Sequence, residues 1–123
     1  MVRVIPTESQ EQIALFEWAA YQTARLPGIE LMYHIPNGGR RDAREAARFK
    51  AEGVKAGYPD ICLPVARNGY HGLYIELKRV KGGRVSEAQE RCMESLQAQG
   101  YQVEVCKGCE EAVRVIEEYM GGG

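Results

Sequence analysis

The chain has 123 residues, which is enough for one domain with its own hydrophobic core and too few for two. Its 16 basic and 17 acidic side chains leave a formal net charge of -1, which excludes a polycation that coats nucleic acid indiscriminately. No apolar run approaches the roughly 20 residues of a membrane helix, so we expect a soluble protein without membrane contacts.

The first predicted element is a helix that opens with a capping box, in which Thr7 and Gln10 hold the key positions. The run Leu26-Pro27-Gly28 predicts its end. A short strand over residues 30–35 and a second helix over residues 41–52 follow. The apolar residues that recur at helical spacing, and are predicted to form the buried face of the first helix, are Ile13, Ala14, Phe16, Ala20 and Ala24.

A β-hairpin is predicted after the glycine-punctuated loop of residues 53–60. Its two strands alternate apolar with mostly polar residues, and Asn68-Gly69 between them is typical of a hairpin turn. A two-residue loop there would place the apolar residues of one strand on the polar face of the other. A three-residue loop, residues 67–69 with Gly69 left-handed, instead pairs Asp60 with Glu76 and gathers the aliphatic side chains. We predict this second register, with Lys78 on the same face as both acids.

A helix, a strand and a helix complete the chain. Ser86 and Gln89 hold the key positions of a second capping box, which opens a helix that runs to Gly100. A strand over residues 101–106 and a helix over about residues 110–120 follow, so we predict a domain of residues 1–120 and a flexible glycine tail, residues 121–123. The order of elements is typical of a mixed β-sheet flanked by helices, which predicts a single-domain α/β fold.

The predicted hairpin register brings two carboxylates and an ammonium group together at Asp60, Glu76 and Lys78. In a chain with 27% charged residues, an isolated Glu-x-Lys is ordinarily a solvated strand face. Here the Glu-x-Lys pattern also agrees with Pro59-Asp60 in spacing and register, which favours a catalytic site over a solvated strand face. Mg²⁺ prefers oxygen ligands, takes one or two carboxylates and leaves its other positions to water and substrate phosphate. The pattern therefore indicates a divalent-cation site that acts on a phosphate.

Basic residues gather in two stretches, at residues 40–55 and 78–84. Within the first, Arg40, Arg44 and Arg48 share one helix face and could follow a phosphate backbone. The alternative is an ordinary solvated helix face. In the second, two glycines between basic residues either cradle a phosphate or form a plain turn. The candidate nucleic-acid contacts are Asn37, Arg40, Arg41, Arg44, Arg48, Lys55, Lys81 and Arg84.

The chain has four cysteines, at positions 62, 92, 106 and 109, whose redox state depends on the cellular compartment of the protein. The chain begins without the charged-then-apolar segment of a secretion signal, and a domain of this size needs no disulfides. We therefore expect reduced cysteines and a cytoplasmic location. The spacing Cys106-x-x-Cys109 also fits a zinc or redox site, but zinc needs two more suitably spaced ligands, and the sequence offers only two histidines and two unrelated cysteines.

Pro59-Asp60, Glu76-Leu77-Lys78 and the capped helix that begins at Ser86 together resemble the PD-(D/E)xK nuclease superfamily. More narrowly, they resemble its stand-alone VRR-NUC (virus-type replication-repair nuclease) members from phages and bacteria. The resemblance covers nearly the whole chain and includes residues 8–12, 34–39 and 53–60. It implies a restriction-endonuclease-like core and a magnesium- or manganese-dependent endonuclease that leaves 5′-phosphate and 3′-hydroxyl ends, without a nucleotide cofactor. It also implies a homodimer that cleaves branched DNA such as Holliday junctions in a bacterial or phage-infected cytosol.

The same resemblance assigns roles to individual residues. Asp60 and Glu76 are implied to be the metal-binding carboxylates, the Leu77 carbonyl a further ligand, and Lys78 the group that orients or activates the attacking water.

A glutamate of the first helix is implied to complete the acidic cluster. It is matched to Glu8, which stands two residues before a glutamine, while Glu11 offers almost the same spacing. Gln89 matches a family glutamine that supports the site, and Asn37 lies in a segment that could reach it. The alternative function is a non-catalytic nucleic-acid-binding module with the same fold, which the loss of an acid or the lysine would indicate.

Overall fold

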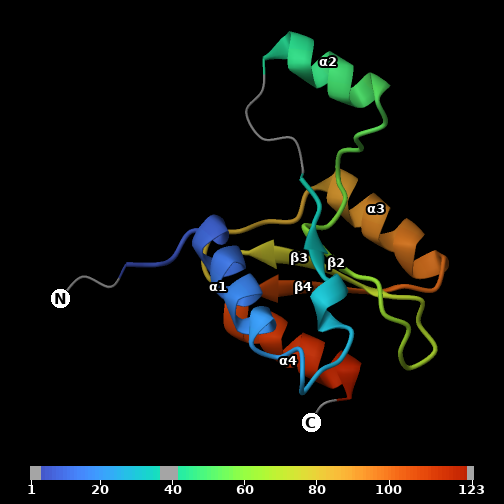
Figure 1. Ribbon diagram of the computed structural model, residues 1–123. Coiled ribbons are helices and arrows are strands. Elements are labelled where there is room, and N and C mark those ends of the chain that lie inside the picture. The colour runs from blue at the N-terminus through green and yellow to red at the C-terminus, as the bar shows by residue number, and fades with distance from the viewer. Residues whose placement is uncertain (1–3, 37–41, 122–123) are drawn as a thin grey trace.

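The computed structural model describes residues 4–36 and 42–121. Over these residues the chain forms a mixed sheet with helices on both faces (Figure 1), as predicted. None of the helices described there is long and apolar enough to cross a membrane. In chain order the elements are α1 (Glu8–Ala20), the 3-10 turn η1 (Ile29–Leu31), β1 (Tyr33–His34), α2 (Ala43–Ala51), β2 (Ile61–Leu63), β3 (Leu73–Lys78), α3 (Glu87–Ala98), β4 (Gln102–Lys107) and α4 (Cys109–Met120).

The sheet has the strand order β1-β2-β3-β4. β1 and β2 pair antiparallel, as do β2 and β3, whereas β4 runs parallel to β3. Helix α3 makes this parallel pairing possible, because it returns the chain to the end of the sheet at which β3 began.

The two faces of the sheet differ in chemistry because side chains alternate along each strand. On one face, Leu73, Ile75 and Leu77 of β3 pack into the hydrophobic core with residues of α1 and α4, including Leu15 and Ile116. Glu76 lies between two of these residues and therefore points to the opposite face, where its side chain meets α3. The polar face of β3 is consequently the face on which a site can form.

The hairpin has the predicted register but not the predicted turn. Ile61 pairs with Ile75 and Leu63 with Leu73, and extension of this register by one residue sets Asp60 opposite Glu76. The loop is nevertheless a two-residue turn at Asn68-Gly69, where both residues have positive φ, 53° and 84°. Between the Leu63–Leu73 pair and the Arg67–Tyr70 pair that closes the turn, the second strand has two residues, 71–72, and the first has three, 64–66. A tight turn at residue 64, with the Val65 amide donating to the Leu63 carbonyl at 2.9 Å, accommodates the extra residue.

Helix α1 begins at its predicted capping box, with Thr7 as N-cap, but ends at Ala20, well before the predicted stop. The predicted buried face is also wrong. Leu15 and Ala19 are buried, whereas Ile13 is 56% exposed and Ala14, Ala20 and Ala24 are exposed as well; of the predicted face only Phe16 packs partly against the core. Apolar residues surround this helix on most sides, so their spacing did not identify the face that packs on the sheet.

The strand predicted over residues 30–35 is limited to β1, because η1 occupies its first residues. Helix α2 begins close to its predicted position, with Asp42 as N-cap, and projects away from the sheet (Figure 1). None of its residues is buried. At the other end of the chain, Gly121 adopts the left-handed conformation and caps α4, and residues 122–123 of the predicted tail lie outside the described residues.

Candidate functional site

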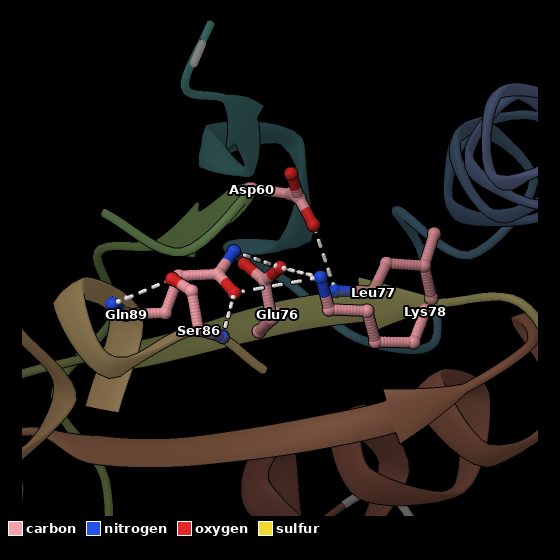
Figure 2. A network of polar contacts seen from close by, with 6 residues as sticks. All are labelled: Asp60, Glu76, Leu77, Lys78, Ser86 and Gln89. Atoms are coloured by element: carbon pink, nitrogen blue, oxygen red, sulfur yellow. Dashed lines mark hydrogen bonds and ion pairs between the residues drawn. The ribbon is translucent and has the colours of Figure 1, made fainter. Parts of the chain in front are cut away.

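Asp60 is held at the start of β2 by contacts from two other strands. Its backbone carbonyl accepts hydrogen bonds from the Ile35 amide at 2.6 Å and from Nδ1 of His34 at 2.8 Å. Its carboxylate oxygen Oδ2 accepts a hydrogen bond from the Leu77 amide of β3 at 2.8 Å. These contacts fix both the backbone and the side chain of Asp60 beside the polar face of β3 (Figure 2).

Glu76 is the buried centre of the site, with only 2% of its surface exposed. Its oxygen Oε2 lies 3.0 Å from the Lys78 ammonium nitrogen and accepts a hydrogen bond from Gln89 Nε2 at 2.6 Å (Figure 2). Its other oxygen, Oε1, is buried and has no hydrogen-bond partner within the described residues. A buried carboxylate oxygen without a partner is costly, and such atoms often mark a place for an ion or water.

Gln89 connects the helix cap of α3 to the site. Its backbone amide donates to Ser86 Oγ at 3.1 Å, while its side-chain Oε1 accepts from the Ser86 amide at 2.9 Å. This capping box leaves Nε2 free to donate to Glu76, and Oε1 also lies 3.5 Å from the Lys78 ammonium. The cap that starts α3 therefore also orients the amide that contacts the buried acid.

Glycines allow the surrounding loops to approach the site closely. A Cβ atom on Gly83 would lie 2.9 Å from Cβ and 3.2 Å from Cδ of Lys78, so the loop covers the stem of the lysine only because this residue has no side chain. Gly57, with φ of 88°, is similarly close to the Ala88 carbonyl in the first turn of α3. The loop before Asp60 and the loop after Lys78 are thus both packed against the site.

The pKa of Glu76 is raised from its ordinary value of 4.5 to about 7. Burial is the largest cause, and the negative charge of Asp60 is the second. Lys78 opposes this shift, through its hydrogen bond and its positive charge, without cancelling it. Holding the two acids close together therefore costs free energy when both are ionised, and the nearby Lys78 ammonium only partly offsets this cost.

This arrangement fits a hard divalent cation. Asp60 and Glu76 supply carboxylate oxygens from neighbouring strands, and the unpartnered Oε1 of Glu76 is a ready ligand atom. Within the described residues, no group of three or more acids, histidines or cysteines is arranged to hold a metal. A site with two carboxylates suits Mg²⁺ or Mn²⁺, because Mg²⁺ keeps several of its positions for water and phosphate.

The two glutamates considered in the first helix occupy different environments. Glu8 is exposed in the first turn of α1. Glu11 accepts a hydrogen bond from the Cys109 amide at 3.2 Å and so caps α4, whose own N-cap residue is Gly108. The structure thus gives Glu11 a role at a helix terminus and leaves the carboxylate of Glu8 at the surface.

The candidate nucleic-acid contacts fall into two groups. Arg44 and Arg48 are exposed on α2, and Lys55 is exposed in the loop that follows it. Lys81 and Arg84 are exposed in the loop that covers the stem of Lys78. The other three candidates, Asn37, Arg40 and Arg41, lie outside the described residues.

The cysteines do not form the alternative site. All four are free, and Cys106 is buried in the core while Cys109 begins α4. Burial raises the pKa of Cys106 to about 12, which disfavours the thiolate that zinc binding and redox chemistry need. The described residues contain no further ligands arranged around this pair.

Some contributors were not assigned to the site from the sequence. His34 and Ser86 act through hydrogen bonds to the backbone of Asp60 and to Gln89, and Gly83 acts through its lack of a side chain. The capping box gave a signal for Ser86, because its position three residues before Gln89 is visible in the sequence. His34 depends on a contact with a residue 26 positions away, and Gly83 on how its loop folds back over Lys78, neither of which a local pattern reveals.

Comparisons with known proteins found a matching family and a similar solved structure. The family model for the VRR-NUC domain matches residues 6–110. A solved structure described as a VRR_NUC domain protein is 35% identical, covers 98% of this chain and 93% of its own, and superposes with a TM-score of 0.83. No curated protein matches the sequence.

Proposed function

Because the chain belongs to the VRR-NUC family, whose members are nuclease-type proteins, we propose that it is a metal-dependent DNA endonuclease. The observation that carries this proposal is a pair of acids with Glu76 buried and Asp60 half-buried beside it: Glu76 has an unpartnered oxygen and a pKa of about 7. A buried acid placed beside a second acid stabilises a fold poorly, but it prepares a cation site. The proposed reaction is hydrolysis of a phosphodiester bond.

Asp60 and Glu76 are proposed to hold Mg²⁺ or Mn²⁺, with the Leu77 carbonyl as a further ligand. The ion supplies two things when bound, namely a lower pKa for a coordinated water and compensation for negative charge on the phosphate. The Leu77 amide already donates a hydrogen bond to Asp60. The backbone of β3 therefore helps to hold the Asp60 carboxylate in the site. Glu8 is retained as the proposed third acid of the cluster.

Lys78 is proposed to orient the attacking water and to place a positive charge beside the phosphate. Its side chain is 11% exposed and its ammonium group is held by Glu76 and Gln89, so its position is fixed before a substrate arrives. Gln89 keeps Oε2 of Glu76 turned toward the lysine, which leaves Oε1 available for the cation. Gln89 therefore acts on the reaction through Glu76.

Branched DNA, such as a Holliday junction, is the proposed substrate, and a homodimer is the proposed active form. A domain of 13.8 kDa with one site can cut two symmetry-related strands only if two copies act together. Light scattering should therefore give twice the mass of the chain, and a monomer that still makes paired cuts would contradict this arrangement.

The test is cleavage of a labelled four-way junction, a flap and a linear duplex under single-turnover conditions with Mg²⁺, Mn²⁺ or a chelator. We expect cutting with either metal and none with the chelator. Lys78→Ala should lower the rate by about 100-fold or more, because it removes a group positioned at the reacting water. Lys107→Ala is the matched control, because Lys107 pairs with Lys78 on the next strand but is exposed, and it should keep the rate at saturating DNA.

Tight binding without cleavage of any substrate would contradict the proposal. That outcome would instead indicate a non-catalytic nucleic-acid-binding module with the same fold.

A further inference from the structure

Aromatic side chains continue the polar face of the sheet beyond the acidic site. Tyr74 lies two residues before Glu76 on β3, so the two side chains share one face and their backbones are about 7 Å apart. Tyr33 of β1 pairs with Cys62 of β2, which in turn pairs with Tyr74. One row across the sheet therefore reads Tyr33, Cys62, Tyr74, directly beside the site.

Further rings extend this row. Tyr58, two residues before Asp60, meets Tyr74 with ring centroids 6.3 Å apart. Tyr101 meets Tyr74 from the other side at 5.2 Å, and His71 meets Tyr101 at 5.8 Å. All three contacts are edge to face, the arrangement that aromatic rings favour. The rings hold one another in place while remaining partly exposed.

The sheet register places two tyrosines beside Cys62, one on either side. Tyr33 and Tyr74 are the strand partners of Cys62 on its two sides, and Cys62 is buried between them. Tyr33 is nevertheless 49% exposed. The core tyrosine, Tyr119, is different: it is 2% exposed and its hydroxyl donates to the Val65 carbonyl at 2.6 Å. Tyr33 thus sits at a paired position of the sheet with about half of its surface exposed, which core packing alone does not require.

We propose that Tyr33, Tyr58, Tyr74 and Tyr101, here called the tyrosine row, form a stacking surface for unpaired bases of the DNA strand that enters the acidic site. This inference rests on the proposed nuclease function and narrows its branched-DNA substrate to one with a single-stranded segment beside the scissile phosphate, which a flap has and a fully paired four-way junction lacks. Every base has an aromatic face, so such a surface is tolerant of sequence. A ring that is already oriented loses little freedom on binding, which favours affinity.

The position of the tyrosine row favours nucleotides as its occupant. A phosphate at Asp60 and Glu76 places the adjoining nucleotide within reach of Tyr74, because the acid and the ring are separated by only two residues of one strand. The loop of residues 53–60 connects the row to α2, so Lys55 and Tyr58 follow one another closely between the basic helix and the site. Basic side chains and aromatic rings in one path are typical of surfaces that bind single strands.

The test compares a duplex carrying a single-stranded overhang, labelled with 2-aminopurine in the overhang, with the same duplex made blunt. Affinity is measured with Ca²⁺ in place of Mg²⁺. Tyr33→Leu keeps an apolar side chain but removes the ring, and it should weaken binding to the overhang DNA by about 5- to 100-fold while leaving the blunt duplex unchanged. Tyr33→Phe keeps the ring and should stay within about twofold of the wild type. Tyr21→Leu is the matched control, because Tyr21 is 86% exposed at the end of α1.

Quenching of the 2-aminopurine signal by the wild type and Tyr33→Phe, but not by Tyr33→Leu, would support stacking. Equal affinity of the wild type for overhang and blunt DNA, or an equal loss for Tyr33→Leu and Tyr21→Leu, would overturn the inference. Either negative result leaves metal-dependent cleavage and its dependence on Lys78 to be judged separately. Failure of the stacking surface is therefore distinguishable from failure of the nuclease.

Discussion

Glu76 is held in the folded protein in a state that favours its protonated form. Burial and the charge of Asp60 raise its pKa from 4.5 to about 7. In the unfolded chain the carboxyl group titrates near its ordinary value, so between these two pH values the folded protein binds more protons than the unfolded chain. The free energy of unfolding of the metal-free protein must therefore contain a contribution that falls as pH rises.

We expect this contribution to be fully present below about pH 4.5, to decline as pH rises toward 7 and to be lost above that value. At 1.36 kcal/mol per pKa unit, its size is about 3 kcal/mol. Glu76→Gln cannot ionise, so its stability should lack this decline. Urea unfolding in chelator between pH 5 and 8 measures the difference, and parallel pH profiles for the wild type and the variant would contradict the assignment.

The residues of the site differ in how well the sequence predicted them. Asp60, Glu76 and Lys78 meet because alternation in two strands fixes their common face, and alternation is visible in the sequence. The choice between Glu8 and Glu11 was not visible. It depends on the rotation of α1, which is set by the residues that pack on the sheet.

At the scale of elements, helix α2 is the part of the fold that the core explains least. It has a capped N-terminus and contains Arg44 and Arg48 one turn apart, yet buries none of its residues. A helix without a buried face gains little from packing. Contact with a polyanion provides a physical reason for its charge pattern, and Figure 1 shows that it projects from the side of the molecule where residues 53–60 lead to β2.

We expect DNA affinity to fall steeply with salt, because phosphate contacts release counterions. Arg44→Ala combined with Arg48→Ala should weaken binding and reduce the slope of log affinity against log salt by about 2, or about 1 for each lost phosphate contact. Arg114→Ala on α4 is the control, because Arg114 is exposed on a different helix. Fluorescence anisotropy over 50 to 300 mM salt measures both slopes, and a flat dependence for the wild type would remove α2 from the binding surface.

The hairpin shows how a correct prediction can rest on an incorrect detail. The burial of one face required the register that sets Asp60 opposite Glu76, and that requirement held. Asn68-Gly69 nevertheless forms the two-residue turn that its composition favours, with the extra residue placed at 64–66. Local turn chemistry and long-range burial were both satisfied, because a tight turn elsewhere in the strand absorbed the difference.

At the scale of the whole molecule, the site lies on the sheet face opposite the main core. The core of α1, α4 and the aliphatic side of the sheet fixes β3, and α3 covers part of the other face. The class of fold could be predicted from the order of elements, and the family comparison and the similar solved structure confirm it. The tyrosine row beside the site could not, because it joins residues from two strands and two loops that only the folded sheet brings together.

Calorimetric titration of Mn²⁺ into the metal-free protein tests most directly whether Asp60 and Glu76 hold a divalent cation. The wild type should bind Mn²⁺ and, near pH 7, release protons as Glu76 ionises, which two buffers of different ionisation enthalpy reveal. Asp60→Asn and Glu76→Gln should each lose at least about tenfold in affinity, whereas Glu17→Gln, at an exposed position of α1, should bind like the wild type. Equal Mn²⁺ affinity in all four proteins would contradict the proposed cation site.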